Sequence, residues 1–325
     1  MSMLYLTEDD VRRLLPMGVA IELMQTAFER LASGEALNQP RRRLILPTGS
    51  VLHYMAAGDG QHYGAKIYAT NPRRGAHFLF LLYRASDAEP LAILEANHLG
   101  QIRTGAVSGL ATKLMAREDA ATLAIVGSGF QARAQLEAML TVREITQVSV
   151  WSRDPGKRTA FVTWAAAEFG KRFGHAIRAA DTAERAVRGA QIVVTATFAK
   201  EPVLSADWIE PGTHINAMGS NQAARREIPT ELVHRADTIA VDSIEQARME
   251  SGDLLMAFNE QEWSAARVME LKDVVTGRMQ ARSTPQQITL FKSNGLAVED
   301  VIAAAFVYER ARATGVGRSV PAPHS

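Results

Sequence analysis

Two arginines, a lysine and a methionine in the first third of the sequence are candidates for a substrate pocket. Arg42 lies in a run of three arginines after Pro40, Met55 and Lys66 follow, and Arg103 stands in Ile-Arg-Thr-Gly. An arginine binds a carboxylate through two parallel hydrogen bonds. A lysine desolvated between arginines has a lowered pKa and exchanges protons near neutral pH. Each residue alone is compatible with a surface role, but Lys66 interrupts the apolar register of a predicted strand.

The turn at residues 127–132, Gly-Ser-Gly-Phe-Gln-Ala, has the spacing of a phosphate-binding turn. Such turns need glycine for a tight bend, for close approach of the backbone to a pyrophosphate and for packing of the helix on the strand. Gly127 and Gly129 fill the first two positions, and Ala132 is a permitted third residue. An apolar strand precedes the turn and a helix is predicted after it, which favours a dinucleotide site over a merely structural turn.

The end of the next predicted strand favours NADP(H) over NAD(H). An NAD enzyme usually has Asp or Glu there, which binds the ribose hydroxyls. This sequence has Ser152 and Arg153, with Lys157 and Arg158 one helical turn further on. A hydroxyl and a guanidinium suit a 2′-phosphate, although the same residues could form a solvated basic surface at the start of a helix.

The first third of the chain predicts two short helices and an antiparallel sheet. Thr7 begins a helical pattern that continues around Pro16. Short β-like runs separated by turn residues follow, and a long helix rich in small residues is expected at about 100–115. The expected strands are 43–46, 51–55, 64–68 and 78–83.

From 121 to about 242 the pattern alternates between apolar strands and helices, which predicts a parallel sheet covered on both faces. The fold class is therefore α/β, a Rossmann-type doubly wound parallel sheet plus a smaller α+β domain. The expected strands are 123–126, 148–151, 192–197, 214–217 and 238–241, and the expected helices between them are 132–140, 154–169 and 184–188. A further, strongly periodic helix is expected at 296–313, in the last stretch of the chain. The Pro-rich tail, 319–325, is expected to be disordered.

Composition excludes several classes of protein. The 325 residues are enough for two domains, and the net charge of +1 gives no global field for nucleic acid or a membrane surface. With no cysteine, there is no disulfide or thiolate site. The eight histidines include no pair at ligand spacing, so no metal site is expected. Without a signal-peptide pattern or a transmembrane run, a cytoplasmic location is expected.

A series of motifs along nearly the whole chain resembles the ornithine cyclodeaminase/μ-crystallin family. The motifs are Pro-x-Arg at 40–42, Gly-x-Lys at 64–66, Ile-Arg-Thr-Gly-Ala at 102–106, Gly-x-Gly-x-Gln-Ala at 127–132, Ile-Asn-Ala-Met-Gly at 215–219 and Phe-Lys-Ser-Asn-Gly-Leu-Ala-Val-Glu-Asp at 291–300. The resemblance implies a homodimer. It also implies a substrate and dimerisation domain of residues 1–116 completed by 296–325, and a Rossmann domain of 117–295.

The resemblance also implies roles for individual residues. Arg42 and Arg103 would hold the substrate carboxylate, Lys66 would act near the reacting nitrogen, and Met55 and Asn221 would line the pocket. Gln131 would lie by the pyrophosphate, Ala217, Met218 and Ser293 by the nicotinamide, and Thr195 and Thr197 by the adenosine half. The full expected cofactor set is Thr104, Gly127, Gly129, Phe130, Gln131, Ser152, Arg153, Thr195, Thr197, Ala217, Met218 and Ser293.

Two departures from the cyclodeaminase pattern favour net reduction. Cyclodeaminases have an Asp where this sequence has Asn221, and an amide cannot balance the charge of a substrate ammonium. The acidic residue that favours NAD is also missing at Ser152. We therefore expect NAD(P)H-dependent reduction of a small α-imino acid, such as Δ1-pyrroline-2-carboxylate or Δ1-piperideine-2-carboxylate. The alternatives are an alanine or N-alkyl-amino-acid dehydrogenase, an ornithine cyclodeaminase, and a non-enzymatic NADPH-binding protein like μ-crystallin.

Overall fold

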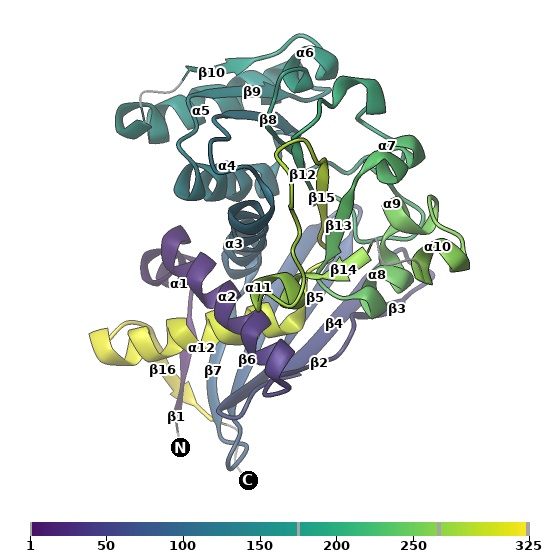
Figure 1. Cartoon of the computed structure of the whole chain (residues 1–325). Coiled ribbons are helices and arrows are strands. Elements are labelled where there is room, and N and C mark those ends of the chain that lie inside the picture. Colours follow the sequence, from purple (N-terminus) through teal and green to yellow (C-terminus); the bar gives the residue numbers. More distant parts are fainter. Residues whose placement is uncertain (1, 174–175, 265–267, 323–325) are drawn as a thin grey trace. The chain divides into compact units, whose positions relative to one another are not determined.

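The computed structural model describes residues 2–173, 176–264 and 268–322, and the chain divides into two compact units (Figure 1). Unit 1 consists of Met1–Arg103 and Gly295–Ser325, and unit 2 of Thr104–Asn294. The first division falls inside the helix α3 (Asn97–Met115). Each unit has its own sheet, which we describe separately.

Unit 1 is built on a mixed sheet with the order β16-β1-β7-β6-β5-β4-β2, in which β3 also pairs with β4. The described strands are β1 (Ser2–Leu6), β2 (Leu37–Asn38), β3 (Arg42–Ile45), β4 (Val51–Gly58), β5 (His62–Asn71), β6 (Gly75–Arg84), β7 (Pro90–Glu95) and β16 (Arg318–Pro321). The expected antiparallel strands are confirmed as β3 to β6. The helices are α1 (Glu8–Leu14), α2 (Met17–Ser33) and α12 (Ala297–Thr314), and α12 packs on α2, β4 and β5.

Two expectations for the ends of unit 1 are wrong. The second helix is not short, because α2 runs for 17 residues to a left-handed Gly34. The tail is not disordered over 319–321, because β16 pairs antiparallel with β1 and so satisfies backbone groups at the sheet edge. Pro321 is tolerated there because an edge strand does not need every N–H. Residues 323–325 lie outside the described part of the chain.

Unit 2 is the expected doubly wound sheet, with the order β10-β9-β8-β11-β12-β15-β13-β14 and parallel pairing throughout its described strands. The strands are β8 (Thr122–Val126), β9 (Gln147–Trp151), β10 (Ala176–Ala179), β11 (Ile192–Thr195), β12 (His214–Ala217), β13 (Thr238–Val241), β14 (Val268–Glu270) and β15 (Thr289–Lys292). The strands β11, β12, β13 and β15 are buried at every position, which explains their continuous apolar character.

The helices of unit 2 connect these strands. They are α4 (Phe130–Val142), α5 (Pro155–Phe173), α6 (Ala183–Val187), α7 (Thr230–Arg235), α8 (Ile244–Glu250), α9 (Gly252–Leu255), α10 (Glu260–Ser264) and α11 (Leu271–Val275), with a 3-10 turn at Ala206–Trp208. The first strand of unit 2, β8, lies inside the sheet, and successive strands extend from it in both directions. In sheets of this kind, ligands bind at the carboxyl ends of the strands where the winding reverses.

The strand β11 is shorter than expected, and β15 is an additional strand beside β12. The run 192–197 forms a strand only as far as Thr195, and the chain then leaves the sheet in a loop. The strand β15 was not expected, yet it lies between β12 and β13. Three neighbouring strands, β11, β12 and β15, therefore end side by side at the carboxyl edge of the sheet.

Candidate functional site

Lys66 lies in the core of unit 1 at the centre of β5. It is opposite Met55 on β4 and Phe80 on β6, and only 3% of it is exposed. Its Nζ atom donates a hydrogen bond of 2.6 Å to Oδ2 of Asp300 and forms an ion pair with it. Because alternate residues of a strand face opposite sides, the lysine belongs to the buried face that α12 covers.

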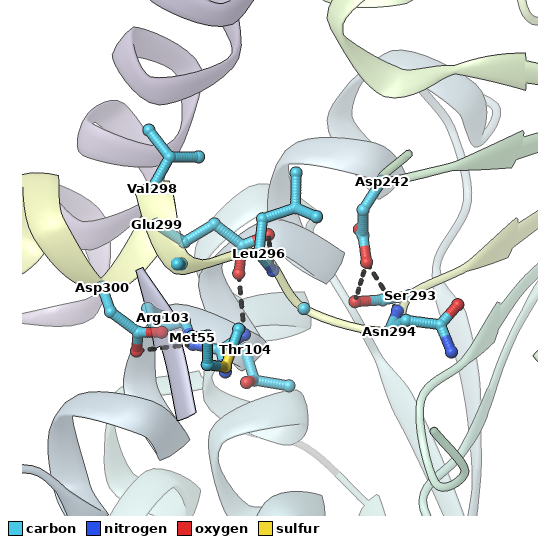
Figure 2. A network of polar contacts seen from close by, with 12 residues as sticks. Met55, Arg103, Thr104, Asp242, Ser293, Asn294, Leu296, Val298, Glu299 and Asp300 are labelled. Atoms are coloured by element: carbon cyan, nitrogen blue, oxygen red, sulfur yellow. Dashed lines mark hydrogen bonds and ion pairs between the residues drawn. The ribbon is translucent and has the colours of Figure 1, made fainter. Parts of the chain in front are cut away.

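Arg103 joins the same carboxylate from α3 (Figure 2). Its Nε donates to Oδ1 of Asp300 at 3.1 Å, and its Nη1 donates to Oε2 of Glu299 at 2.7 Å. Asp300 therefore binds one cation with each of its two oxygens. Because Lys66 and Arg103 come from distant parts of the sequence, this carboxylate determines how far apart the two cations lie.

The first turn of α12 presents both acidic side chains. Asn38 Oδ1 accepts hydrogen bonds from the backbone N–H groups of Ala297 and Val298, at 2.8 and 3.2 Å, and so caps the helix. Gly295 precedes this turn with φ of +78°, and a Cβ on it would lie 2.6 Å from Arg103 Nη1. Position 295 therefore requires glycine, both for its positive φ and for Arg103 to reach Glu299.

Arg41, and not Arg42, is the arginine of this cluster. Arg42 is exposed on β3 opposite Tyr54. Arg41 is 4% exposed, and its Nη2 lies 3.5 Å from the Met55 sulfur and 3.4 Å from the carbonyl oxygen of Gly295. The structure thus brings Arg41, which directly precedes β3, into the cluster and leaves the expected Arg42 outside it.

The electrostatics of the cluster favour a lysine that titrates near neutral pH. Burial, and then the charge of Arg103, lowers the pKa of Lys66 to about 8, while Asp300 opposes this shift. This confirms the expected lowering. Burial raises the pKa of Asp300, but the charges of Arg103 and Lys66 outweigh burial, so the net shift is downward. Three cations face two carboxylates, which leaves a formal charge of +1 that one substrate carboxylate would balance.

The glycine turn of unit 2 fits a pyrophosphate. Gly127 has φ of +121°, and a Cβ there would lie 2.4 Å from the carbonyl oxygen of Ala196, so this position requires glycine. Gly129 caps α4, and a Cβ on it would meet no atom within 4 Å. The open space lies at a helix N-terminus, whose N–H groups and dipole attract anions. Beside it, the buried Gln131 Oε1 has no hydrogen-bond partner within the described chain.

Two further positions complete the environment of the turn. Ala132 is fully buried, as the third position of the motif requires. A Cβ on Gly105 would lie 2.5 Å from the carbonyl oxygen of Ala134, so glycine allows the two helices to pack closely. Phe130 is 45% exposed at the first position of α4. The carbonyl oxygen of Thr104 accepts a hydrogen bond from Gln135 Nε2 at 3.2 Å.

Ser152 lies at the end of β9, next to the turn. Ser128 donates to its hydroxyl at 2.8 Å, and Arg158 Nη1 donates to its carbonyl oxygen at 3.4 Å. Arg153 is exposed beside it. The carboxylate of Asp154 accepts the backbone N–H of Lys157 and so caps α5. Two guanidinium groups therefore accompany the serine at this strand end.

The remaining expected cofactor residues lie at the ends of β11, β12 and β15. The hydroxyls of Thr195 and Thr197 donate to Glu227, at 2.9 and 2.7 Å. Ala217 and Met218 are buried at the end of β12. Ser293 donates to Oδ2 of Asp242 at 2.9 Å, which also accepts the N–H of Asn294 (Figure 2).

Sequence analysis missed the carboxylates that organise these residues. Asp300 and Glu299 end the motif at 291–300. Their partners Lys66 and Arg103 are distant in sequence, so no local pattern indicates these contacts. Glu227 and Asp242 carry no motif signal at all. Asn221, expected in the substrate pocket, is partly buried in the loop after β12.

No helix among the described residues is long and apolar enough to cross a bilayer. No group of three or more His, Asp or Glu side chains in the described ranges is arranged to hold a metal ion.

The role of Asp300 can be tested by the variant Asp300→Asn. Removing this charge leaves two buried cations without their shared carboxylate, so the free energy of unfolding should fall by about 3–5 kcal/mol. The matched control is Glu309→Gln on the same helix, whose exposed carboxylate lies 3.6 Å from Arg312 and should contribute at most about 1 kcal/mol. Urea unfolding measures both, and equal losses would contradict the role of Asp300.

Comparisons with known proteins agree with these features. The family model for the ornithine cyclodeaminase/mu-crystallin family matches residues 1–315. The chain is 35% identical to the Δ1-pyrroline-2-carboxylate reductase of Bacillus cereus over 329 residues, covering 98% of this chain and 99% of the relative.

Solved structures resemble the whole chain. The structure of Thermococcus litoralis Δ1-pyrroline-2-carboxylate reductase in complex with NADH and L-proline has a TM-score of 0.92 at 33% identity, covering 98% of this chain and 100% of that chain. An archaeal alanine dehydrogenase dimer with bound NAD has a TM-score of 0.90 at 30% identity, covering 99% of each chain. This chain therefore belongs to the ornithine cyclodeaminase/mu-crystallin family.

Proposed function

We propose that this protein reduces a small α-imino acid to the L-amino acid at the expense of NAD(P)H. The preferred substrates are cyclic ketimines such as Δ1-pyrroline-2-carboxylate and Δ1-piperideine-2-carboxylate. The observation that carries the proposal is the buried Lys66, which Asp300 holds beside Arg103 and whose pKa is about 8. The similarity of this chain to two Δ1-pyrroline-2-carboxylate reductases also supports the proposal.

In this mechanism unit 1 binds the substrate and controls a proton. Arg41 and Arg103 donate hydrogen bonds to the substrate carboxylate, which adds the negative charge that the cluster lacks. Lys66 Nζ donates a proton to the imine nitrogen, because positive charge on that nitrogen makes the neighbouring carbon electrophilic. The dinucleotide, when bound in unit 2, supplies the hydride.

We propose NADP(H) over NAD(H) as the dinucleotide. Ser152, Arg153 and Arg158 offer a hydroxyl and two guanidinium groups at the end of β9, and no carboxylate stands at position 152 or 153. A 2′-phosphate would be attracted by this set, as its charge favours bidentate donors. The two similar structures described above contain NADH and NAD. A preference of this protein for NADH over NADPH would contradict the proposal.

Asn221 separates reduction from cyclodeamination. An aspartate at this position would balance a substrate ammonium, whereas an amide has no charge to do so. A second candidate function is amino-acid dehydrogenation, which the similarity to the archaeal alanine dehydrogenase favours. It would use the same carboxylate-binding arginines and the same lysine, with ammonia and a keto acid replacing the cyclic imine.

A substrate panel tests the activity and the cofactor together. Cyclic imino acids, pyruvate with ammonia, and ornithine are each incubated with NADPH or NADH, and absorbance at the nicotinamide band is followed. Oxidation of NADPH with a cyclic imino acid, faster than that of NADH, is expected. Turnover only with pyruvate and ammonia indicates the dehydrogenase, and proline formed from ornithine without net cofactor change indicates the cyclodeaminase.

Lys66→Met tests the proton donor. Methionine keeps most of the length of the side chain but has no proton to give, so kcat/KM for imine reduction should fall by about 10²–10⁴-fold. The matched control, Lys113→Met, replaces an exposed lysine of α3 and should stay close to wild type. Near-wild-type activity of Lys66→Met would remove this lysine from the mechanism.

We further propose that unit 1 mediates a homodimer. The sheet face opposite Lys66 and Met55 is apolar and exposed on β3 to β6, where Leu44 is 55% exposed and Tyr54 is 47% exposed. Leu52, Ile67 and Leu79 continue this face on neighbouring strands. Such patches mark protein interfaces, and the similar alanine dehydrogenase is a dimer.

The dimer can be tested by sedimentation velocity. Wild-type protein should sediment as a dimer at micromolar concentration, and Leu52→Glu, which buries a charge in the interface, should shift it to monomer. The control Leu37→Glu lies in the short outer strand β2, away from the centre of this face, and should remain a dimer. A monomeric wild type would overturn this proposal.

A further inference from the structure

Glu227 is a fully buried carboxylate that the mechanism above does not use. It lies in unit 2 between β12 and α7, and its side chain accepts four hydrogen bonds. The donors are the hydroxyls of Thr195 and Thr197, at 2.9 and 2.7 Å, and the backbone N–H groups of Thr197 and Gly219, at 2.7 and 2.6 Å. An ionised carboxylate accepts all four, since it has about four lone-pair positions.

These donors come from the end of β11 and from the loops after β11 and β12, at the carboxyl edge of the sheet. Thr195 ends β11 and Thr197 follows it, while Gly219 lies two residues after the end of β12. A Cβ on Gly219 would lie 2.2 Å from the Thr197 carbonyl oxygen and 2.4 Å from Glu227 Oε1. One carboxylate therefore holds the two loops at a separation that leaves no room for a side chain at position 219.

A buried ion pair between Asp253 and Lys292 holds the backbone of Glu227. Asp253 Oδ1 accepts the backbone N–H groups of Glu227 and Ile228, at 2.6 and 2.9 Å. Its other oxygen lies 3.0 Å from Lys292 Nζ, which also donates to the carbonyl oxygen of Ser220 at 2.5 Å. Lys292 ends β15, so the network connects the ends of β11, β12 and β15.

The network also engages the hydroxyl groups of the two threonines. A hydroxyl has a single proton to donate, and Thr195 and Thr197 both direct it to Glu227. Their contribution to a ligand would therefore come through the loop that they fix and not through their own O–H donors.

We propose that Glu227 is a positioning residue for the dinucleotide site, which fixes the loops after β11 and β12 in the arrangement that receives the cofactor. This inference rests on the proposed use of a nicotinamide dinucleotide. It does not depend on the identity of the imino acid, so it can be tested by binding alone.

The first test is the dissociation constant of NADPH and of NADH for the full-length Glu227→Gln variant, measured by fluorescence titration without substrate. The glutamine presents an N–H₂ group to donors, so the loops should separate and affinity for the preferred dinucleotide should fall by about tenfold or more. The matched control is Glu250→Gln, a buried carboxylate of α8 bonded to Gln246, which should bind within about twofold of wild type. Unchanged affinity in a folded Glu227→Gln variant would overturn the proposal.

A double-mutant cycle separates positioning from direct contact. Thr197→Val removes one donor to Glu227 and should weaken binding, whereas Thr197→Ser keeps the hydroxyl and should bind nearly as wild type does. If both residues act through the same loop, Thr197→Val adds little to Glu227→Gln. Effects that multiply would instead indicate separate contacts with the ligand and would contradict the proposal.

Failure of this inference can be distinguished from failure of the proposed function. Wild-type protein that binds a dinucleotide but turns over no imino acid overturns the function, while the binding cycle still decides the role of Glu227. Wild-type protein that binds neither dinucleotide overturns both. If Glu227→Gln does not fold, the comparison of Thr197→Val with Thr197→Ser decides the question, and equal affinities of these two variants overturn the proposal.

Discussion

The site of unit 1 depends on one interaction, the sharing of the Asp300 carboxylate between Lys66 and Arg103. Two cations buried together would repel each other and lose their hydration, which a protein tolerates only when a carboxylate binds both with good geometry. Asp300 does so with one oxygen for each cation. Asn38 caps the start of α12, and Gly295 allows the chain to turn into this helix beside Arg103. Together they place the Asp300 carboxylate next to β5.

The same solution recurs in unit 2, where buried carboxylates organise strand ends. Glu227 joins the loops after β11 and β12, and Asp242 holds the residues after β15. In both units several of the residues expected to meet small molecules, among them Lys66, Thr197 and Ser293, are held by buried acidic side chains. Burying polar donors removes their hydrogen bonds to water, which costs free energy. Hydrogen bonds to a buried carboxylate offset that cost.

Much of the fold could be predicted because its signals are local. The apolar runs of unit 2 and the glycine turn at 127–132 are readable within a few residues, as were the strands β3 to β6. The pairing of β1 with β16 joins the two ends of the described chain, so no local pattern indicates it. Arg41 was missed because the phase of a strand is uncertain by one residue at its start. The role of Asp300 was missed because its partners lie 234 and 197 residues away.

We propose above all that this buried environment makes Lys66 a proton donor near neutral pH. The most direct measurement is an NMR titration of the lysine side-chain resonances of the cofactor-free protein, with the Lys66 signal assigned by its absence in a variant. A pKa of about 8 is expected for Lys66, with the ammonium form lost as the pH rises through that value. A midpoint near the ordinary lysine value of about 10.4 would contradict it.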